Sequence, residues 1–166
     1  YRALRADADR GAAFVVIGGG FIGSEVAAAL RQRGNAVTLA FPEAAIGDRI
    51  FPARLAAAVN DTYRAQGVEV LAGAPVPGIE AGADGATVTL GDGRRLAADR
   101  IVAGIGIVPD VALARAAVLA VENGILVAEH LHTTTADIYA PGAVANYPDA
   151  IPGTRRRAGH AHATRD

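Results

Sequence analysis

The sequence predicts an α/β fold, a three-layer domain with a central parallel sheet, and two observations support this prediction. First, short apolar segments and longer segments of helical periodicity follow one another from residue 12 to residue 71 in the order β-α-β-α-β. Second, the first strand segment, residues 12–17, is apolar throughout and is bounded by glycines, which is typical of a parallel strand buried on both faces. This order is the half-unit of a doubly wound sheet, so we expect a Rossmann-type domain.

The first half of the chain supplies two strand–helix units and a third strand. Strands are expected at residues 12–17, 36–41 and 68–71, and helices at residues 21–33 and 52–66. A glycine follows each helix, as is usual at a helix C-terminus, and Pro52 suits the first turn of the second helix. We expect that helix to bury one face made of Leu55, Val59 and Tyr63.

The middle of the chain predicts an antiparallel β-meander laid over the parallel sheet. Three short alternating segments are expected as its strands: residues 76–80, 86–90 and 94–98. The turn Gly91-Asp92-Gly93 is a strong hairpin signal, because its glycines tolerate positive φ. Later elements are expected as a parallel strand at 100–103, a helix at 111–117, and strands near 125–127 and 138–140. We expect one domain over residues 1–147 and a polar, basic, loosely ordered tail over residues 148–166.

Composition and charge exclude several classes of protein. The formal net charge is -1, so no long-range field attracts nucleic acid or an anionic membrane. The absence of cysteine excludes a disulfide framework, a thiolate metal site and a redox-active dithiol. No apolar run approaches the ~20 residues that span a bilayer, and residues 1–10 lack the apolar region of a signal peptide. We expect a cytoplasmic protein without nucleic-acid or membrane partners.

Two histidine pairs are candidates for a metal site. His130 and His132 are two residues apart, as are His160 and His162, so on a strand each pair would face one way. No further ligand clusters near either pair, and surface histidines are the favoured interpretation. We therefore expect no metal ion.

A glycine-rich turn after the first strand predicts a dinucleotide-binding loop. The segment Gly18-Gly19-Gly20-Phe21-Ile22-Gly23 fits the pattern G-x-G-x-x-G, with a buried strand before it and a helix after it. In this setting Gly18 permits the tight turn, Gly20 lets a pyrophosphate approach the backbone, and Gly23 lets the helix pack closely. The N–H groups of the helix start then face the diphosphate. A plain glycine turn between strand and helix is the alternative.

Acidic residues near this loop indicate which dinucleotide it holds. Glu43 lies just past the second strand, where a carboxylate accepts hydrogen bonds from both ribose hydroxyls of an adenosine. Like charges ~4 Å apart repel by roughly 4 kcal/mol at an effective dielectric of about 20, on the order of a thousandfold in affinity. A 2′-phosphate is thereby disfavoured, so NAD(H) is predicted, although Arg49 could instead serve a phosphate and Glu43 could be an exposed loop acid. Glu25 either complements the helix dipole or lies at the nicotinamide end of the cleft.

Four segments, in order along nearly the whole chain, carry a family resemblance. They are Ile17-Gly-Gly-Gly-Phe-Ile-Gly-Ser-Glu25, Phe41-Pro-Glu43, Ala103-Gly-Ile-Gly-Ile-Val-Pro-Asp110 and Asp137-Ile-Tyr-Ala140. They resemble the NAD-binding domain of FAD-dependent ferredoxin reductases and of apoptosis-inducing factor, within the pyridine nucleotide-disulfide oxidoreductase family. The resemblance implies these placements: Phe21, Ile22 and Glu25 beside the nicotinamide, with Gly104, Ile105 and Gly106 approaching it through the backbone, Glu43 on the adenosine ribose, and Arg49 near the adenosine end.

In enzymes of this kind, NADH gives its hydride to FAD, and FAD passes single electrons to an iron–sulfur protein. The resemblance therefore implies no catalytic side chain in this domain, because the flavin carries the chemistry and the protein supplies orientation and electrostatics. Residues 118–147 would lead back toward a flavin domain, which has no counterpart in this sequence, and neither has the C-terminal interface domain.

Two motifs that contact the flavin in the resembled family are altered here. The family's Ala-Gly-Asp reads Pro141-Gly142-Ala143, so the carboxylate is replaced by a methyl group. The family's Glu-His-x-Asp-Asn-Ala reads as residues 159–164, with only His160 in place. We expect this chain alone to bind NAD(H) but not FAD, as an excised, engineered or decayed domain would.

Three functions are compatible with these features. The first is the NAD(H)-binding domain of a ferredoxin-reductase-like oxidoreductase, which positions the nicotinamide for hydride transfer to a flavin. The second is a non-catalytic NAD(H) sensor or scaffold, and the third is an enzyme whose flavin half comes from another chain. Without a flavin domain, four side chains would be left exposed and favour self-association: Ile138, Tyr139, Val144 and Tyr147.

Overall fold

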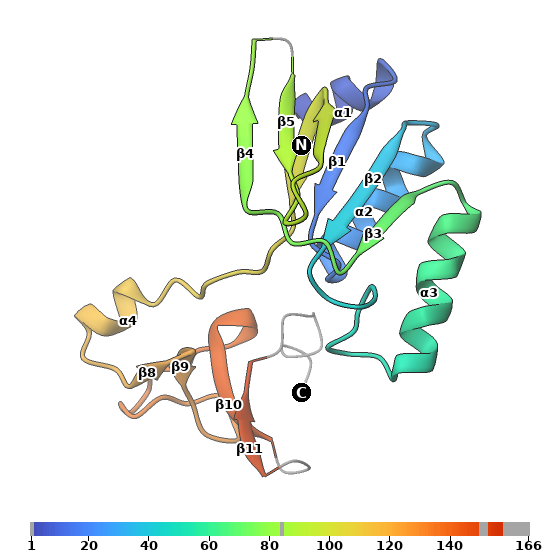
Figure 1. Ribbon diagram of the computed structural model, residues 1–166. Coiled ribbons are helices and arrows are strands. Elements are labelled where there is room, and N and C mark those ends of the chain that lie inside the picture. The colour runs from blue at the N-terminus through green and yellow to red at the C-terminus, as the bar shows by residue number, and fades with distance from the viewer. Residues whose placement is uncertain (1, 84, 150–152, 158–166) are drawn as a thin grey trace. The chain divides into compact units, whose positions relative to one another are not determined.

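The computed structural model in Figure 1 describes residues 2–83, 85–149 and 153–157. The chain divides into two compact units, unit 1 over residues 1–106 and unit 2 over residues 107–166. This division lies well before residue 147, where the sequence-based domain was expected to end. No helix of the described residues is long and apolar enough to cross a membrane. The cytoplasmic location stays a prediction.

A four-stranded parallel sheet forms the centre of unit 1, as the sequence predicts. Its strands are β1 (Phe14–Ile17), β2 (Val37–Phe41), β3 (Glu69–Ala72) and β7 (Arg100–Ala103), in the order β3-β2-β1-β7. β1 pairs in parallel with both β2 and β7, with Ile17 opposite Ala40 on one side and Ala103 on the other. All four side chains of β1 are buried, which explains its unbroken apolar sequence.

Alternate side chains of β1 enter two different cores. Phe14 and Val16 pack with residues from the helices on one face of the sheet. These helices are α1 (Arg2–Asp9), α2 (Phe21–Gln32) and α3 (Ala53–Ala65). Val15 and Ile17 pack on the other face with residues of the antiparallel meander β4 (Gly78–Ala81), β5 (Ala86–Thr89) and β6 (Arg95–Ala98). Helices, sheet and meander are the three layers of unit 1 (Figure 1).

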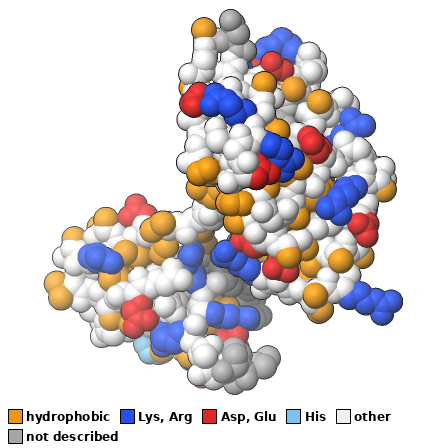
Figure 2. Space-filling view, in the orientation of Figure 1, with side chains coloured by type: hydrophobic (Ala, Val, Ile, Leu, Met, Phe, Trp, Pro, Cys, Tyr) orange, Lys and Arg blue, Asp and Glu red, His pale blue; other side chains and the backbone are white. Residues whose placement is uncertain are grey.

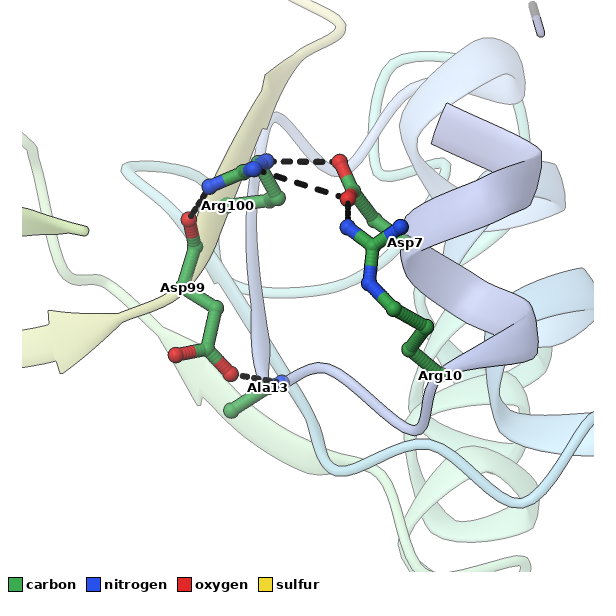
Figure 3. Close-up of polar contacts among 5 residues, drawn as sticks. All are labelled: Asp7, Arg10, Ala13, Asp99 and Arg100. Atoms are coloured by element: carbon green, nitrogen blue, oxygen red, sulfur yellow. Dashed lines mark hydrogen bonds and ion pairs between the residues drawn. The ribbon is translucent and has the colours of Figure 1, made fainter. Parts of the chain in front are cut away.

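The first helix, α1, was not predicted, and a buried carboxylate attaches it to the sheet. The Asp7 side chain is only 8% exposed and accepts a hydrogen bond from Nε of Arg100 in β7 at 2.6 Å. Arg10 donates to Oδ1 of the same carboxylate (Figure 3). Next to this pair, the carboxylate of Asp99 accepts a hydrogen bond from the N–H of Ala13 at 2.7 Å. Ion pairs between distant segments thus hold the helix in place, together with the packing of Leu4 and Ala8 against the core.

The predicted buried face of α3 was wrong at one position. Leu55 is 50% exposed, whereas Ala56 and Asn60 are buried and Val59 and Tyr63 are partly buried against the core. Val59 and Tyr63 can face the core with the helix rotated so that either Leu55 or Ala56 is buried beside them. The observed rotation brings the amide of Asn60 to the loop after β2, where it makes two hydrogen bonds.

Unit 2 contains a short helix and a small mixed sheet. Its elements are α4 (Ala112–Ala116), β8 (Val121–Glu122), β9 (Gly124–Leu126), a 3-10 turn (Gly142–Val144), β10 (Ala145–Asp149) and β11 (Thr154–Arg156). The strand order is β11-β10-β9-β8, with β9 and β10 parallel and the other pairs antiparallel. Three residues form its core, Val127, Ala140 and Ala145, with Ile125, Leu131 and Tyr147 packed against them.

Two predictions for this unit were wrong. Residues 138–140 form no strand, and the region contributes only an isolated bridge between His132 and Tyr139. The basic segment after residue 148 is not loose where it is described, because β11 pairs with β10. Arg155 donates to the carbonyls of Val127 and Asn146 at 2.6 and 2.5 Å, so these contacts order a segment whose composition is typical of a tail.

Charge and metal-ligand predictions concern the surface of both units. On the face shown in Figure 2, basic and acidic side chains are interspersed and do not gather into one basic patch. No group of three or more histidine, aspartate or glutamate side chains within the described ranges could hold a metal ion. His130 lies in a turn and His132 in the isolated bridge, while His160 and His162 fall outside the described residues.

Candidate functional site

The carboxyl edge of the parallel sheet holds the glycine-rich turn. Gly18 follows β1, and Gly104 follows the neighbouring strand β7. From β1 the chain proceeds through β2 to β3 on one side, and it returns on the other side as β7, so the strand order reverses between β1 and β7. In open α/β sheets, ligands bind outside the carboxyl ends of the strands at such a point of reversal.

Three glycines let the start of α2 pack directly against the ends of β1 and β7. A Cβ on Gly23 would lie 1.9 Å from the carbonyl oxygen of Gly18, and a Cβ on Gly18 would lie 2.4 Å from that of Gly104. A Cβ on Gly104 would in turn lie 2.8 Å from the nitrogen of Gly23. Gly18 also has a φ of 110°, which disfavours any residue with a side chain. The close approach of these backbones therefore accounts for Gly18, Gly23 and Gly104.

Gly20 differs from these three because packing does not require it. A Cβ at this position would meet no atom within 4 Å, and the residue has an ordinary extended backbone with φ -80° and ψ -173° at the N-cap of α2. Its carbonyl accepts hydrogen bonds from the N–H of Ser24 at 3.0 Å and from the Ser24 hydroxyl at 2.9 Å. The carbonyl is thus engaged within the helix, while the Cα faces open space beside the positive end of the α2 dipole.

The loop after β2 brings Glu43 and Arg49 together. Nη2 of Arg49 lies 2.7 Å from Oε1 of Glu43, and the two side chains are 83% and 24% exposed, respectively. The carbonyl of Glu43 accepts a hydrogen bond from the N–H of Gly73 at 2.8 Å, which fixes the backbone of Glu43 beside the end of β3. The acid and the base that the sequence associates with the adenosine end therefore form one ion pair.

This loop is also attached to the glycine-rich turn, through residues that sequence reasoning missed. The N–H of Gly47 donates to the carbonyl of Gly19 at 2.9 Å. Asn60 of α3, which is 5% exposed, accepts from the N–H of Ile46 at 2.9 Å and donates to the carbonyl of Ala44 at 3.3 Å. One signal was present in the sequence, an asparagine within the otherwise apolar face of a helix. A buried side-chain amide usually forms hydrogen bonds with particular protein groups, so a buried asparagine indicates such a contact.

The remaining predicted residues lie around the start of α2 and the end of β7. The side chains of Phe21, Ile22 and Ile105 are 41%, 61% and 77% exposed, which is high for large apolar groups. Glu25 is exposed one turn further along α2. Gly106 has a φ of 104° and would meet no atom within 4 Å through a Cβ. Exposed apolar and acidic side chains are thus available at the start of α2 and after the end of β7.

Comparison with known proteins shows the family of this chain. The family described as pyridine nucleotide-disulphide oxidoreductase matches residues 2–164. Monodehydroascorbate reductase 3 from Arabidopsis thaliana is 36% identical over 149 residues, which are 89% of this chain and 34% of that protein. Putidaredoxin reductase CamA from Pseudomonas putida is 40% identical over 136 residues, which are 80% of this chain and 32% of that protein.

A solved structure agrees with these relatives. The ferredoxin reductase for the CYP199A2 system from Rhodopseudomonas palustris superimposes with a TM-score of 0.90 at 30% identity, covering 98% of this chain and 40% of that one. The chain spans about a third of the length of the curated relatives it matches. The family match over almost all of the sequence leads to one conclusion: this chain belongs to the pyridine nucleotide-disulphide oxidoreductase family.

Proposed function

We propose that unit 1 binds NAD(H) at the carboxyl edge of its parallel sheet, as the nucleotide-binding part of a ferredoxin-reductase-like, FAD-dependent oxidoreductase. The observation that carries the proposal is the open space over Gly20, at the start of α2 and at the point where the strand order reverses. A side chain at any other glycine of the turn would collide with neighbouring protein atoms. A side chain at Gly20 would not, so the absence of one there affects only a ligand that binds over the turn.

The residues present fit a dinucleotide along this edge. The diphosphate would lie over Gly20, where the first-turn N–H groups of α2 and the helix dipole favour an anion. The ribose diol of the adenosine would be held by Glu43, at the end of the adjacent strand β2. The nicotinamide would lie at the opposite end, beside Phe21, Ile22 and Glu25 and the backbone of residues 104–106.

In this proposal the residues of the site bind and orient the nucleotide, and none of them is assigned the role of acid, base or nucleophile. Apolar side chains with the exposure of Ile22 and Ile105 suit one face of a nicotinamide ring and would exclude water from it. A nicotinamide nucleotide supplies the hydride when it is bound. This domain would contribute by holding the nicotinamide ring in a fixed orientation, close to the group that accepts the hydride.

A separate part of the proposal concerns the flavin that would accept the hydride. Ala143 lies in the 3-10 turn of unit 2, where the resembled family has a carboxylate, and its carbonyl already accepts a hydrogen bond from Arg157 at 3.2 Å. We propose that this chain alone does not bind FAD, which also favours a second function, an NAD(H)-binding module without turnover. By likeness to relatives named as ferredoxin reductases, an iron–sulfur protein is the proposed electron acceptor of a complete enzyme.

Calorimetric titration with NADH and NADPH, combined with a visible spectrum of the purified protein, tests these proposals. We expect NADH to bind more tightly than NADPH and the spectrum to show no flavin band. Binding of neither nucleotide would contradict the proposed site, and a co-purified flavin would contradict the interpretation of Ala143. If a flavoprotein partner restores NADH oxidation above the background rate, the module without turnover is excluded.

A further inference from the structure

Asn123 forms the turn of the β8–β9 hairpin in unit 2 (Figure 1), between Glu122 and Gly124. Its two neighbours pair with each other across the turn, and Val121 pairs with Ile125. The Asn123 side chain is exposed, and it forms no hydrogen bond with any other residue that the structure describes. The carbonyl carbon of this side chain is therefore accessible and unrestrained.

The residue after Asn123 supplies a nucleophile from the main chain. An asparagine side chain can react with the main-chain nitrogen of the next residue, and a side chain on that next residue hinders the reaction. Gly124 has no side chain, and the fold does not permit one. A Cβ there would lie 2.4 Å from the carbonyl oxygen of Val144, and the φ of Gly124 is 113°. Packing thus retains an unhindered nitrogen directly after an exposed asparagine.

The other three asparagines of the chain lack both features. Asn35, Asn60 and Asn146 are 1%, 5% and 5% exposed, and none of them is followed by glycine. Two hydrogen bonds also hold the side chain of Asn60. A buried segment must open locally before its side chain can change its geometry and react, which slows the reaction. Exposure and the following residue together therefore distinguish Asn123.

We propose that Asn123 is a site of spontaneous deamidation. The main-chain nitrogen of Gly124 forms a bond to the side-chain carbonyl carbon of Asn123. The bond from that carbon to the side-chain nitrogen breaks, and the side-chain nitrogen leaves as ammonia with the proton that the nucleophile gives up. The product of this step is a succinimide ring. The inference concerns unit 2 alone and does not depend on nucleotide binding.

Water then opens the ring at one of its two carbonyl carbons. Attack at the former side-chain carbon breaks its new bond to nitrogen and gives aspartate with an ordinary backbone. Attack at the main-chain carbon gives isoaspartate, in which the backbone passes through the former side chain. Overall, one water is consumed and one ammonia is released, and no group is oxidised or reduced. Both products carry a negative charge that the amide lacked.

Isoaspartate changes the hairpin as well as its charge. It adds one carbon atom to the main chain of a turn whose flanking residues, Glu122 and Gly124, face each other directly. β8 has two residues and lies at the edge of its sheet, in the order β11-β10-β9-β8. The N–H of Leu126 donates to the carbonyl of Ala120 at 2.9 Å and closes the hairpin. We expect this hydrogen bond to be lost in the isoaspartate form.

Incubation of the purified protein in mildly alkaline buffer, followed by peptide mass spectrometry, measures the loss of amide at each asparagine. The peptide that contains Asn123 should gain the mass difference between an amide and an acid and separate into two products, aspartate and isoaspartate. Its amide should be lost about tenfold faster, or more, than those of Asn35, Asn60 and Asn146, the factor that corresponds to about 1.4 kcal/mol of local opening.

Hydrogen exchange of the isoaspartate form tests the structural consequence. The amide of Leu126 should exchange faster than in the unmodified protein. The amide of Val127 donates to the carbonyl of Asn146 at 3.1 Å, on the β10 side of β9, and is the internal control. Its exchange should remain unchanged, because the pairing of β9 with β10 does not involve the turn.

Two variants provide matched controls, and circular dichroism verifies that each is folded. Asn123→Gln keeps the amide but requires a larger ring, so its mass should remain constant over the same incubation. Asn123→Asp introduces the charge without the additional backbone atom, so the amide of Leu126 should stay protected. Loss of amide at Asn123 no faster than at the three buried asparagines would overturn the proposal, and so would an equal mass gain in Asn123→Gln. Faster exchange of Leu126 in Asn123→Asp would overturn the role of the lengthened backbone.

Discussion

The open space over Gly20 allows folding and binding to be separated by adding one methyl group. In Gly20→Ala the new Cβ would meet no protein atom within 4 Å, and the backbone at φ -80° and ψ -173° is accessible to alanine. The same methyl group would lie where the diphosphate is proposed to contact the start of α2. We therefore expect a folded protein that has lost most of its affinity for NADH.

The expected stability of Gly20→Ala follows from two opposing effects. Alanine restricts the unfolded chain more than glycine does, which stabilises the fold by about 0.4–1 kcal/mol. Alanine is also a poorer N-cap residue than glycine, at a cost of about 0.5–1 kcal/mol. Because the two effects nearly cancel, the free energy of unfolding should change by less than about 0.5 kcal/mol.

The expected loss of binding is much larger. A methyl group that keeps the diphosphate away from the α2 amides removes one or more hydrogen bonds to a charged group, each contributing about 1.5–3 kcal/mol. The dissociation constant for NADH should therefore rise by about 10- to 100-fold. NADPH binding should weaken in the same proportion, because both nucleotides carry the diphosphate.

Gly23→Ala is the control with the opposite signature. Its Cβ would lie 1.9 Å from the carbonyl oxygen of Gly18, more than an ångström closer than real Cβ atoms approach, and the obstacle is backbone. Such overpacking costs about 1–3 kcal/mol, which outweighs the gain of about 1 kcal/mol from the helix propensity of alanine. We expect a lower melting temperature, by about 2–4 °C for each kcal/mol.

Thermal unfolding and calorimetric titration of both variants provide the test. A Gly20→Ala protein that is as stable as the parent but binds NADH with the parent's affinity would refute the placement of the diphosphate. A Gly20→Ala protein that is strongly destabilised would refute the conclusion that packing leaves this position free.

Four further predictions concern other parts of the chain. Asn60→Ala should lower the free energy of unfolding by about 1–3 kcal/mol in urea titration, because a buried N–H of the Glu43 loop loses its acceptor. Asp7→Ala should cost a similar amount, about 1–3 kcal/mol, by releasing α1 from β7, while hydrogen exchange of the meander stays unchanged. The side-chain hydrogen bond from Arg95 lowers the pKa of Glu80 below its ordinary value of 4.5. The stability that this ion pair contributes should therefore be present above pH 4.5 and decline as the pH falls below it; acid unfolding at low and high salt measures this, and salt should weaken the effect. Self-association, expected from exposed Ile138 and Tyr139 at 40% and 62%, should be visible by light scattering and be reduced in Tyr139→Ser; a monomer at high concentration would contradict it.

Local patterns predicted most of unit 1, and their failures have identifiable causes. The central strands β1 and β2 follow from burial on both faces, which is a property of neighbouring residues. α1 was missed because few of its residues are apolar, and part of what holds it is an ion pair between Asp7 and Arg100, 93 residues apart in the sequence. In unit 2, the expected strand at 138–140 has only a single bridge, and pairing with β10 orders the basic segment at 154–156.

By itself, the sequence determined the glycine-rich turn between a buried strand and a helix, and an acid at the end of the next strand, because these features depend on spacing along a short stretch of chain. Only the tertiary structure decided that Gly104 closes against Gly18 and Gly23, that Gly20 alone among these faces open space, and that Arg49 is paired with Glu43. The physical reason is that these properties depend on which backbones and side chains are brought within a few ångströms of one another, and no local pattern specifies that.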